Sequence, residues 1–278
     1  MKRYRRTAAS QYIIVILILV CIIGFGILGT ILMGRVPFED YFVMPWAAGR
    51  SWLLEGTSPY DPSVAILAES TPSQSDYLAS LPEKAVFIEP VLNLIFYLPF
   101  RLLPYEISRA IWVTLIVLIT GLIGYLSLKI ADWKISTLTF FSILTMSVFW
   151  FPSIFSAMTG QLSPIVIVLI LLGIYLILIN QDTTAGFLFA LTFASLPTTA
   201  LIFLFIVVWS IVKRRWSILS AYFAGIAFLM AVSLLMLPNW PLDWLRVLLD
   251  TYENLNWVKT PLMRLADMLP GVANFLSI

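Results

Sequence analysis

Carboxylates are the side chains on which any acid–base chemistry of this chain must depend. The 278 residues include no histidine and a single cysteine, Cys21, which lies inside an apolar run. Histidine bases, histidine triads and metal sites built from histidine or thiolate ligands are therefore excluded. More than half of the fifteen acidic residues fall between positions 35 and 90. They are Glu39, Asp40, Glu55, Asp61, Glu69, Asp76, Glu83 and Glu89.

Asp40 is the strongest catalytic candidate among these acids. It follows the first long apolar run, at a point where a carboxylate could face water and lipid headgroups and take a proton from a hydroxyl. We expect a helix to begin just after it, and the positive end of that helix would favour the charged carboxylate. The alternatives are a helix N-cap or a solvated loop acid. Its neighbour Glu39 is better explained as solvated.

Five further residues are candidates for binding a substrate, and each has a simpler explanation. Arg50 could hold a phosphate in the fork of its guanidinium, or it could extend from an interfacial helix toward water. Tyr60 could line the site or belong to an aromatic belt. Asp61, in "SPYDPS", is also typical of an Asx turn. Glu89 lies at the end of an apolar segment, where an acid is costly and so a functional candidate. Gln161 could contact substrate or simply open a helix.

The composition of the chain indicates the kind of fold that positions these residues. Hydrophobic residues make up 60% and charged residues 12%, against about 25% charged residues in soluble domains. We therefore predict an all-α, polytopic transmembrane helical bundle. An external loop, 35–86, should carry a short interfacial helix over 42–54. The expected spans are 12–34, 85–103, 110–128, two within 135–181, 183–212 and 217–237.

Proline and glycine predict where the long apolar runs break. Residues 183–212 are too long for one straight crossing of a hydrocarbon core of about 30 Å, so we expect a break near Pro197. The segment "SAMTGQLSP", 156–164, should separate the two spans of 135–181.

The distribution of charge predicts the orientation in the membrane. The basic start "MKRYRR" and the basic "KRRW", 213–216, indicate the cytoplasmic side, and the first helix should stay uncleaved. Two topologies meet these conditions. In the first, which we favour, both 85–103 and 183–212 cross once, which gives seven spans. In the second, 85–103 only dips into the membrane and 183–212 goes out and back. The two place Gln161 on opposite sides.

The end of the chain has no clear span. Residues 1–237 form the expected transmembrane module, and 238–278 an interfacial C-terminal segment. Within it, "NWPLDWLRVLLDTY" predicts an interfacial helix with Trp240 and Trp244 in the aromatic belt. This helix should lie on the same side as the loop 35–86.

The order of these features resembles glycosyltransferase family 87 of the GT-C superfamily. Asp40 opens "DYFVMPWAAGRSWLLEG", and a turn with Gly56, Pro59, Tyr60 and Asp61 follows. Next come "FIEPVLNLIFYLP", the pair Gly160-Gln161 and a hairpin that ends in "KRRW". The chain departs from the family pattern at two places. Leu196-Pro197 replaces the Lys-Pro that is usual in the family, and Glu89-Pro90 replaces the usual Pro-Pro. We also expect the remaining spans of the usual family module to be absent.

The resemblance implies a membrane hexosyltransferase of the bacterial cytoplasmic membrane. Such an enzyme moves a sugar, with mannose expected, from a polyprenyl-phosphate donor to a hydroxyl of a glycolipid or polysaccharide acceptor. Transfer takes place on the extracytoplasmic side with inversion, and an acid after the first helix, here Asp40, acts as base. The alternatives are an inactive GT-C relative or membrane scaffold, and a transporter of lipid-linked substrates. A transporter should show internal repeats, and none is evident.

No cofactor and no nucleic-acid partner are expected. Asp40 with Glu39 or Asp61 could hold Mg²⁺, but nothing in the sequence requires a metal. No glycine-rich phosphate loop that would indicate a nucleotide occurs.

Overall fold

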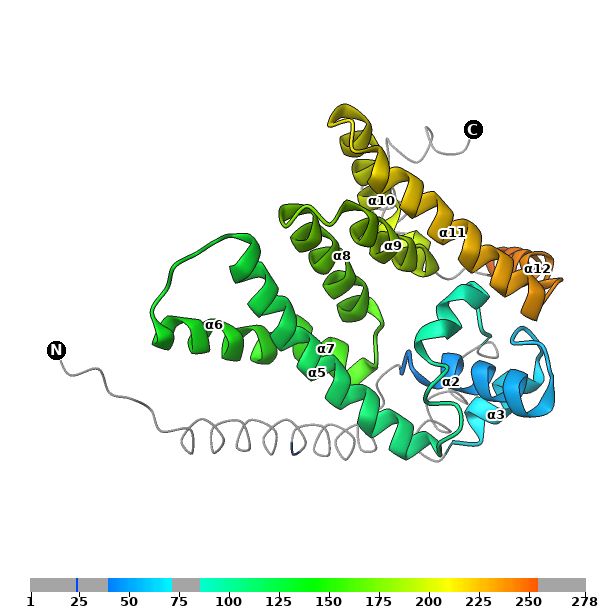
Figure 1. Ribbon diagram of the computed structural model, residues 1–278. Coiled ribbons are helices and arrows are strands. Elements are labelled where there is room, and N and C mark those ends of the chain that lie inside the picture. Colours follow the sequence, from blue (N-terminus) through cyan, green and yellow to red (C-terminus); the bar gives the residue numbers. More distant parts are fainter. Residues whose placement is uncertain (1–23, 25–39, 72–85, 255–278) are drawn as a thin grey trace, which may run out of the picture.

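The structure is a computed structural model that describes residue 24, residues 40–71 and residues 86–254. Within these residues every regular element is a helix (Figure 1). The prediction of an all-α membrane bundle is confirmed for this part of the chain. The expected first span 12–34 falls almost wholly outside the described residues.

The helix expected over 42–54 forms, but in two parts. The α-helix α2, Val43–Arg50, continues into a π-helical turn, Ser51–Glu55, which ends at Gly56 with a left-handed φ of 68°. Because a π-turn takes more residues than an α-turn, it rotates Leu53 and Leu54 out of the face that Val43 defines. Both leucines are exposed, whereas Val43 is buried. A short helix, α3 (Ser63–Glu69), follows.

The segment expected to cross the membrane as span 85–103 does not form a spanning helix. Within the described residues 86–103, the only helix is a 3₁₀-helix, Val91–Phe96, and turns occupy most of the stretch up to Leu103. Six residues at about 2 Å each cover about 12 Å, well short of a hydrocarbon core of about 30 Å. The first long helix of the described part is α5, Tyr105–Ile130, which begins directly after Pro104.

Two of the predicted breaks are confirmed, and a further one was not expected. The stretch 135–181 holds α6 (Thr137–Phe149), α7 (Phe151–Thr159) and α8 (Ser163–Leu178). Gly160, with a left-handed φ of 72°, ends α7 inside the expected break. The unexpected break is at Trp150, where α6 and α7 bend by 45°.

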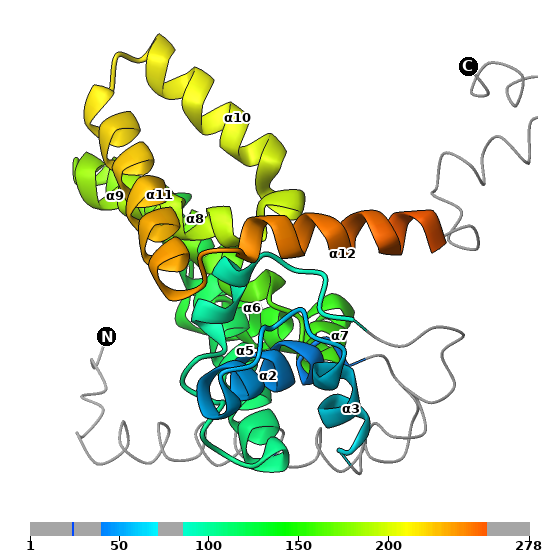
Figure 2. The same cartoon turned by 90° about the vertical axis from the view of Figure 1, so that its right-hand side faces the viewer.

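The run 183–212 breaks beside Pro197, as expected. It divides into α9 (Asp182–Thr192), a 3₁₀-turn (Phe193–Ser195) and α10 (Leu196–Val212). Pro197 lies in the first turn of α10, where its missing N–H leaves no helical hydrogen bond unmade. Then α11, Trp216–Met236, runs back beside α10 as the second arm of an open hairpin (Figure 2).

An ion pair decides how the run 183–212 is arranged. Arg215 Nη1 lies 2.9 Å from Asp182 Oδ1, so the start of α9 and the end of α10 lie at the same end of the bundle. The run therefore goes out and back rather than crossing once. The described residues 86–103 hold no spanning helix, which departs from the favoured seven-span arrangement. The described helices fit the second topology, and the number of crossings stays a prediction.

By length and composition, α5 and α11 can each span a membrane, and the bent pair α6–α7 can form a third span. The expected C-terminal helix forms as α12, Trp240–Asn254. It lies across the end of α11, near α2 (Figures 1 and 2). Trp240 is 5% exposed and donates from Nε1 to Ser233 Oγ, so it packs in the core instead of a belt. Trp244 Nε1 donates to Ile88 O, which ties α12 to the segment before the 3₁₀-helix.

Candidate functional site

Asp40 lies in a buried cluster at the meeting point of three parts of the chain. Its Oδ1 accepts a hydrogen bond of 2.8 Å from Phe42 N–H, in the turn that leads into α2. Its Oδ2 accepts from the Tyr105 hydroxyl and from Arg109 Nε, which lies 3.0 Å away. Tyr105 and Arg109 stand one turn apart on α5, so one face of that helix holds the carboxylate.

Arg109 joins this carboxylate to the end of α7. Its Nη1 and Nη2 donate to the carbonyls of Ala157 and Met158, in the last turn of that helix. These carbonyls carry the partial negative charge of a helix C-terminus, which a guanidinium stabilises. Arg109 is 2% exposed, and its charge is balanced by a carboxylate and by helix carbonyls.

Gly160 allows the three parts to approach this closely. A Cβ at this position would lie 2.8 Å from Phe42 Cβ and 3.0 Å from Asp40 Oδ1, and the φ of 72° is one that only glycine adopts easily. Two hydrogen bonds complete the junction, from Trp112 Nε1 to Gly160 O at 3.0 Å and from Tyr41 N–H to Thr159 O at 2.8 Å. The end of α7 therefore lies on the same side of the molecule as the loop before α2.

The burial of Asp40 differs from the sequence-based expectation. A carboxylate facing water was predicted, whereas the side chain of Asp40 is 0% exposed. Removing a charge from water is costly unless the charge is paired and hydrogen-bonded, and here the ion pair and two further donors meet that condition. Asp40 thus has a structural role at the entry to α2, close to the N-cap alternative. Its role as a base stays a prediction.

Tyr60 and Glu89 are brought together at a second place. The Tyr60 hydroxyl donates to Glu89 O at 3.0 Å, and the Tyr60 ring packs on Phe87 at 5.6 Å between centroids. Asn93, on the 3₁₀-helix, donates from Nδ2 to Glu89 Oε2. Burial raises the pKa of the Glu89 carboxyl to about 7, although the hydrogen bond from Asn93 acts in the opposite direction. The half-buried Glu89 can therefore exchange a proton near neutral pH.

Arg50, Asp61 and Gln161 occupy separate positions. Arg50 stacks over the Trp46 ring at 5.6 Å and donates from Nη1 to Arg101 O. Asp61 is exposed, and its Oδ1 accepts from Ser63 N–H at the start of α3, as in an Asx turn. Gln161 donates from its backbone N–H to Ser156 O, which closes the end of α7. Its side-chain oxygen, Oε1, accepts a hydrogen bond of 3.3 Å from the Ser156 hydroxyl.

The residues that surround Asp40 were not predicted. Tyr105, Arg109 and Trp112 recur at helical spacing, i, i+4 and i+7, but this spacing does not by itself show that they contact Asp40. Asn93 was hidden in an apolar segment that was taken for a possible span.

Among the residues that the structure describes, no three acidic or cysteine side chains come together as metal ligands could. Asp40 has its oxygens directed at protein donors, and Asp61 Oδ1 accepts from Ser63 N–H. The pairing of Asp40 with Asp61 in a Mg²⁺ site has no support from these contacts.

Comparison with known proteins places most of the chain in one family. The family model described as glycosyltransferase family 87 matches residues 87–271 of the 278. The matched part includes Glu89, Arg109 and the Gly160 turn, whereas Asp40 and Arg50 precede it. No curated protein matches the chain. No solved structure matches it either.

Proposed function

Because the chain belongs to glycosyltransferase family 87, we propose that it moves mannose from a polyprenyl-phosphate donor to a hydroxyl of a glycolipid or polysaccharide. The reaction inverts the configuration at the sugar carbon and takes place on the extracytoplasmic side of the bacterial cytoplasmic membrane. The N-terminus would lie in the cytoplasm. The apolar helices fit a donor whose lipid tail keeps its phosphate at the membrane surface.

The observation that supports this proposal best is the meeting of Asp40 with the Gly160 turn. These two motifs are far apart in the sequence, and each appears separately in the resemblance to the family. In the structure Arg109 contacts both, through Asp40 Oδ2 and the carbonyls at the end of α7. A carboxylate held by fixed donors is a preorganised group of the kind that catalysis uses.

In the proposed reaction Asp40 is the base. The acceptor oxygen forms a bond to the anomeric carbon, the bond from that carbon to the phosphate oxygen breaks, and polyprenyl phosphate leaves. The proton of the hydroxyl passes to Asp40 Oδ2. In the structure the Tyr105 hydroxyl donates to that oxygen. The hydroxyl of the acceptor would displace the Tyr105 hydroxyl and take its position. Arg109 Nε lies 3.0 Å from the same oxygen and orients the carboxylate.

Sugar transfer by the full-length chain tests this function. Membranes that contain the protein are supplied with radiolabelled mannosyl-phospho-polyprenol, and labelled product is counted. Asp40→Asn should lower the rate by about 10²–10⁴-fold, the usual contribution of a general base. Asp61→Asn, at an exposed turn, is the matched comparison and should have a milder effect than Asp40→Asn.

Asp40→Glu separates lost chemistry from lost structure. It keeps the charge opposite Arg109 and should retain more transfer than Asp40→Asn at equal amounts of folded protein, measured by size-exclusion chromatography. Transfer by Asp40→Asn at the wild-type rate would remove Asp40 from the reaction. The enclosed state of Asp40 favours the alternative of an inactive relative, and a wild-type chain that transfers no sugar would establish that alternative.

A further inference from the structure

We propose that Arg101 and Arg50 bind the phosphate of a polyprenyl monophosphate, and that the apolar cavity beside Trp52 takes part of its hydrocarbon chain. The identification of the lipid rests on the proposed function. The location rests on contacts of residues that lie on three separate elements.

Arg50 and Arg101 are neighbouring cations, and neither has a carboxylate partner among the described residues. In the part of the chain that the structure describes, the ion pairs join Arg109 to Asp40, Arg215 to Asp182 and Arg246 to Asp243. Arg50 donates from Nη1 to the backbone oxygen of Arg101, at 3.0 Å, which places the Arg50 guanidinium beside the Arg101 backbone. An anion bound there would be attracted by both positive charges.

Arg101 has donors to spare for such an anion. Its Nε and Nη1 are removed from water and have no hydrogen-bond partner among the described residues. The guanidinium stacks over the Trp52 ring at 5.7 Å, a contact that covers its face and leaves the N–H groups of its edge unused. A guanidinium edge matches the oxygens of a phosphate, with two parallel hydrogen bonds. The arrangement lacks only an acceptor of that kind.

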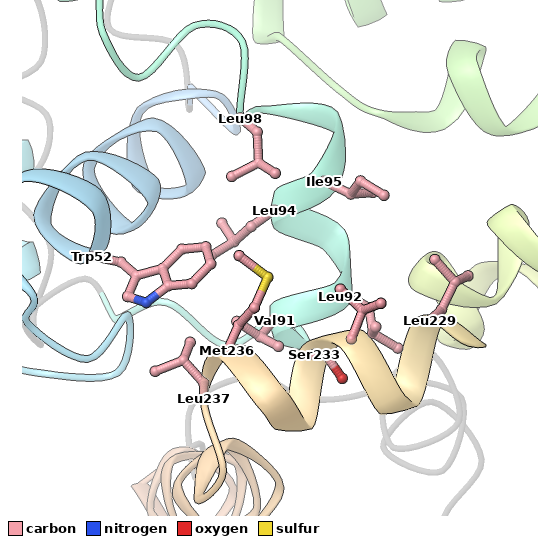
Figure 3. Close-up of a pocket in the computed structure, with 11 residues that line it drawn as sticks. Trp52, Val91, Leu92, Leu94, Ile95, Leu98, Leu229, Ser233, Met236 and Leu237 are labelled. Atoms are coloured by element: carbon pink, nitrogen blue, oxygen red, sulfur yellow. The ribbon is translucent and has the colours of Figure 1, made fainter. Parts of the chain in front are cut away.

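Trp52 also lines an apolar cavity of about 90 Å³ (Figure 3). The opposite walls come from the segment that begins with the 3₁₀-helix and from the end of α11. The lining residues are Trp52, Val91, Leu92, Leu94, Ile95, Leu98, Leu229, Val232, Ser233, Met236 and Leu237. Ser233 is the one polar member, and its hydroxyl is engaged with Met230 O and Trp240 Nε1. The cavity therefore offers a ligand hydrocarbon contacts alone.

The two arginines and the apolar cavity together favour an amphiphilic ligand with one anionic end. An apolar cavity of about 150 Å³ takes up benzene, so this cavity has room for a short stretch of hydrocarbon. One face of Trp52 would then meet the chain and the other the arginine that holds the phosphate. The position also suits transfer, because α2, about 12 Å long, separates Arg50 at its end from Asp40 before its start. A sugar on the phosphate would extend along α2 toward Asp40.

Binding of a defined lipid tests the inference without any need for turnover. The full chain is placed in nanodiscs of phosphatidylcholine, and a C55 polyprenyl monophosphate is titrated while native mass spectrometry counts the bound lipid. Arg101→Gln should weaken binding by about 10- to 100-fold, as expected for the loss of hydrogen bonds to a charged group. Arg50→Gln should act in the same direction. Arg214→Gln, at an exposed basic residue of the other end of the bundle, is the control and should bind like the wild type.

Three further probes separate the parts of the site. The uncharged polyprenol should bind weakly, with no difference between the wild type and Arg101→Gln. Phosphatidylglycerol in excess should not displace the polyprenyl phosphate. Val232→Trp, which fills the cavity from α11, should weaken binding of the C55 lipid with the arginines intact.

Wild-type binding by Arg101→Gln, or equal competition by phosphatidylglycerol, would overturn the inference. In the second case the cations would serve a general anionic lipid. The outcomes remain distinct from those of the transfer assay. Lipid phosphate bound through Arg101 in a chain that moves no sugar would refute the proposed function and leave this site in place.

Discussion

At the scale of single residues, Glu89 is the acid whose protonation the structure ties most directly to stability. Burial raises the pKa of Glu89 to about 7 in the folded chain, whereas an unfolded chain has a value near 4.3. Between these values the folded state binds a proton that the unfolded state has released. The contribution of Glu89 to the free energy of unfolding should therefore be greatest at acidic pH and fall as the pH rises from about 4.5 to about 7.

Glu89→Gln tests this dependence, since glutamine keeps the shape and cannot ionise. Thermal unfolding in detergent is followed from pH 4.5 to 7.5 for both proteins. The wild type should lose stability relative to Glu89→Gln as the pH rises, and the two should converge at the acidic end. Glu106→Gln, on the exposed side of α5, is the control and should follow the wild type. Parallel curves for all three proteins would contradict the assignment.

Gly160 provides a second residue-scale prediction, with a control built into the chain. Gly160 and Gly56 have nearly equal φ values, 72° and 68°, but an added Cβ meets Phe42 and Asp40 at Gly160 and nothing within 4 Å at Gly56. Gly56→Ala should cost about 1–2 kcal/mol for the left-handed backbone alone. Gly160→Ala should cost about 1–3 kcal/mol more, because it also overfills the junction around Asp40. Unfolding in detergent measures both, and equal losses would disprove the tight contact.

The residues of the candidate site were only partly predictable. Charge and position in the sequence identified Asp40, Arg50 and Glu89, each of which has specific contacts in the structure. The partners Tyr105 and Arg109 could not be deduced, because the ion pair joins positions 40 and 109 across a fold that the sequence does not display. The burial of Asp40 has the same cause, since a local rule about loop acids does not include a cation that arrives from α5.

At the scale of elements, the lengths of the apolar runs and the positions of proline predicted well where helices begin and end. They predicted poorly which segments form membrane-spanning helices. The breaks at Gly160 and before Pro197 were predicted because glycine permits the left-handed turn that ends a helix, and proline is excluded from a helix interior. The failure at 85–103 has a different origin. A hydrophobic segment indicates only that its side chains avoid water. Burial of a 3₁₀-helix against α2 and α11 removes such side chains from water as well as a membrane span does.

The contact between α9 and α11 depends on a glycine and yields an element-scale prediction. A Cβ on Gly186 would lie 2.5 Å from the carbonyl oxygen of Ile218 and 2.8 Å from Ala221 Cβ. Small residues permit close approach of helices in membranes, so Gly186→Ala should push α9 from α11 and lower the unfolding temperature. Gly121→Ala, in α5, is the control, because its nearest neighbour would be 3.7 Å away. That change should be neutral or stabilising through helix propensity. Equal effects of the two changes would contradict the close contact.

At the scale of the whole molecule, two polar contacts mark opposite ends of the helical bundle. Asp40 and the Gly160 turn meet at one end, through Arg109, and Asp182 meets Arg215 at the other. The helix α8 connects the two ends, since it begins just after Gly160 and ends just before Asp182. Trp244 contacts Ile88 beside the first end. The sequence correctly grouped the C-terminal helix with the loop region, and its charge balance left the side of Gln161 undecided.

Cysteine labelling of intact cells tests this arrangement. In a Cys21→Ser background, Glu55→Cys, Lys134→Cys and Arg214→Cys each introduce one exposed thiol. With the basic N-terminus inside, Glu55→Cys should react with an impermeant maleimide added outside, because it follows the first span. Since 85–103 does not cross, α5 runs inward, and Lys134→Cys and Arg214→Cys should react only after the membrane is opened. A seven-span chain would instead expose Lys134→Cys outside while Arg214→Cys stayed inside. Lys134→Cys therefore separates the two topologies, and outside labelling at that position would restore a crossing at 85–103.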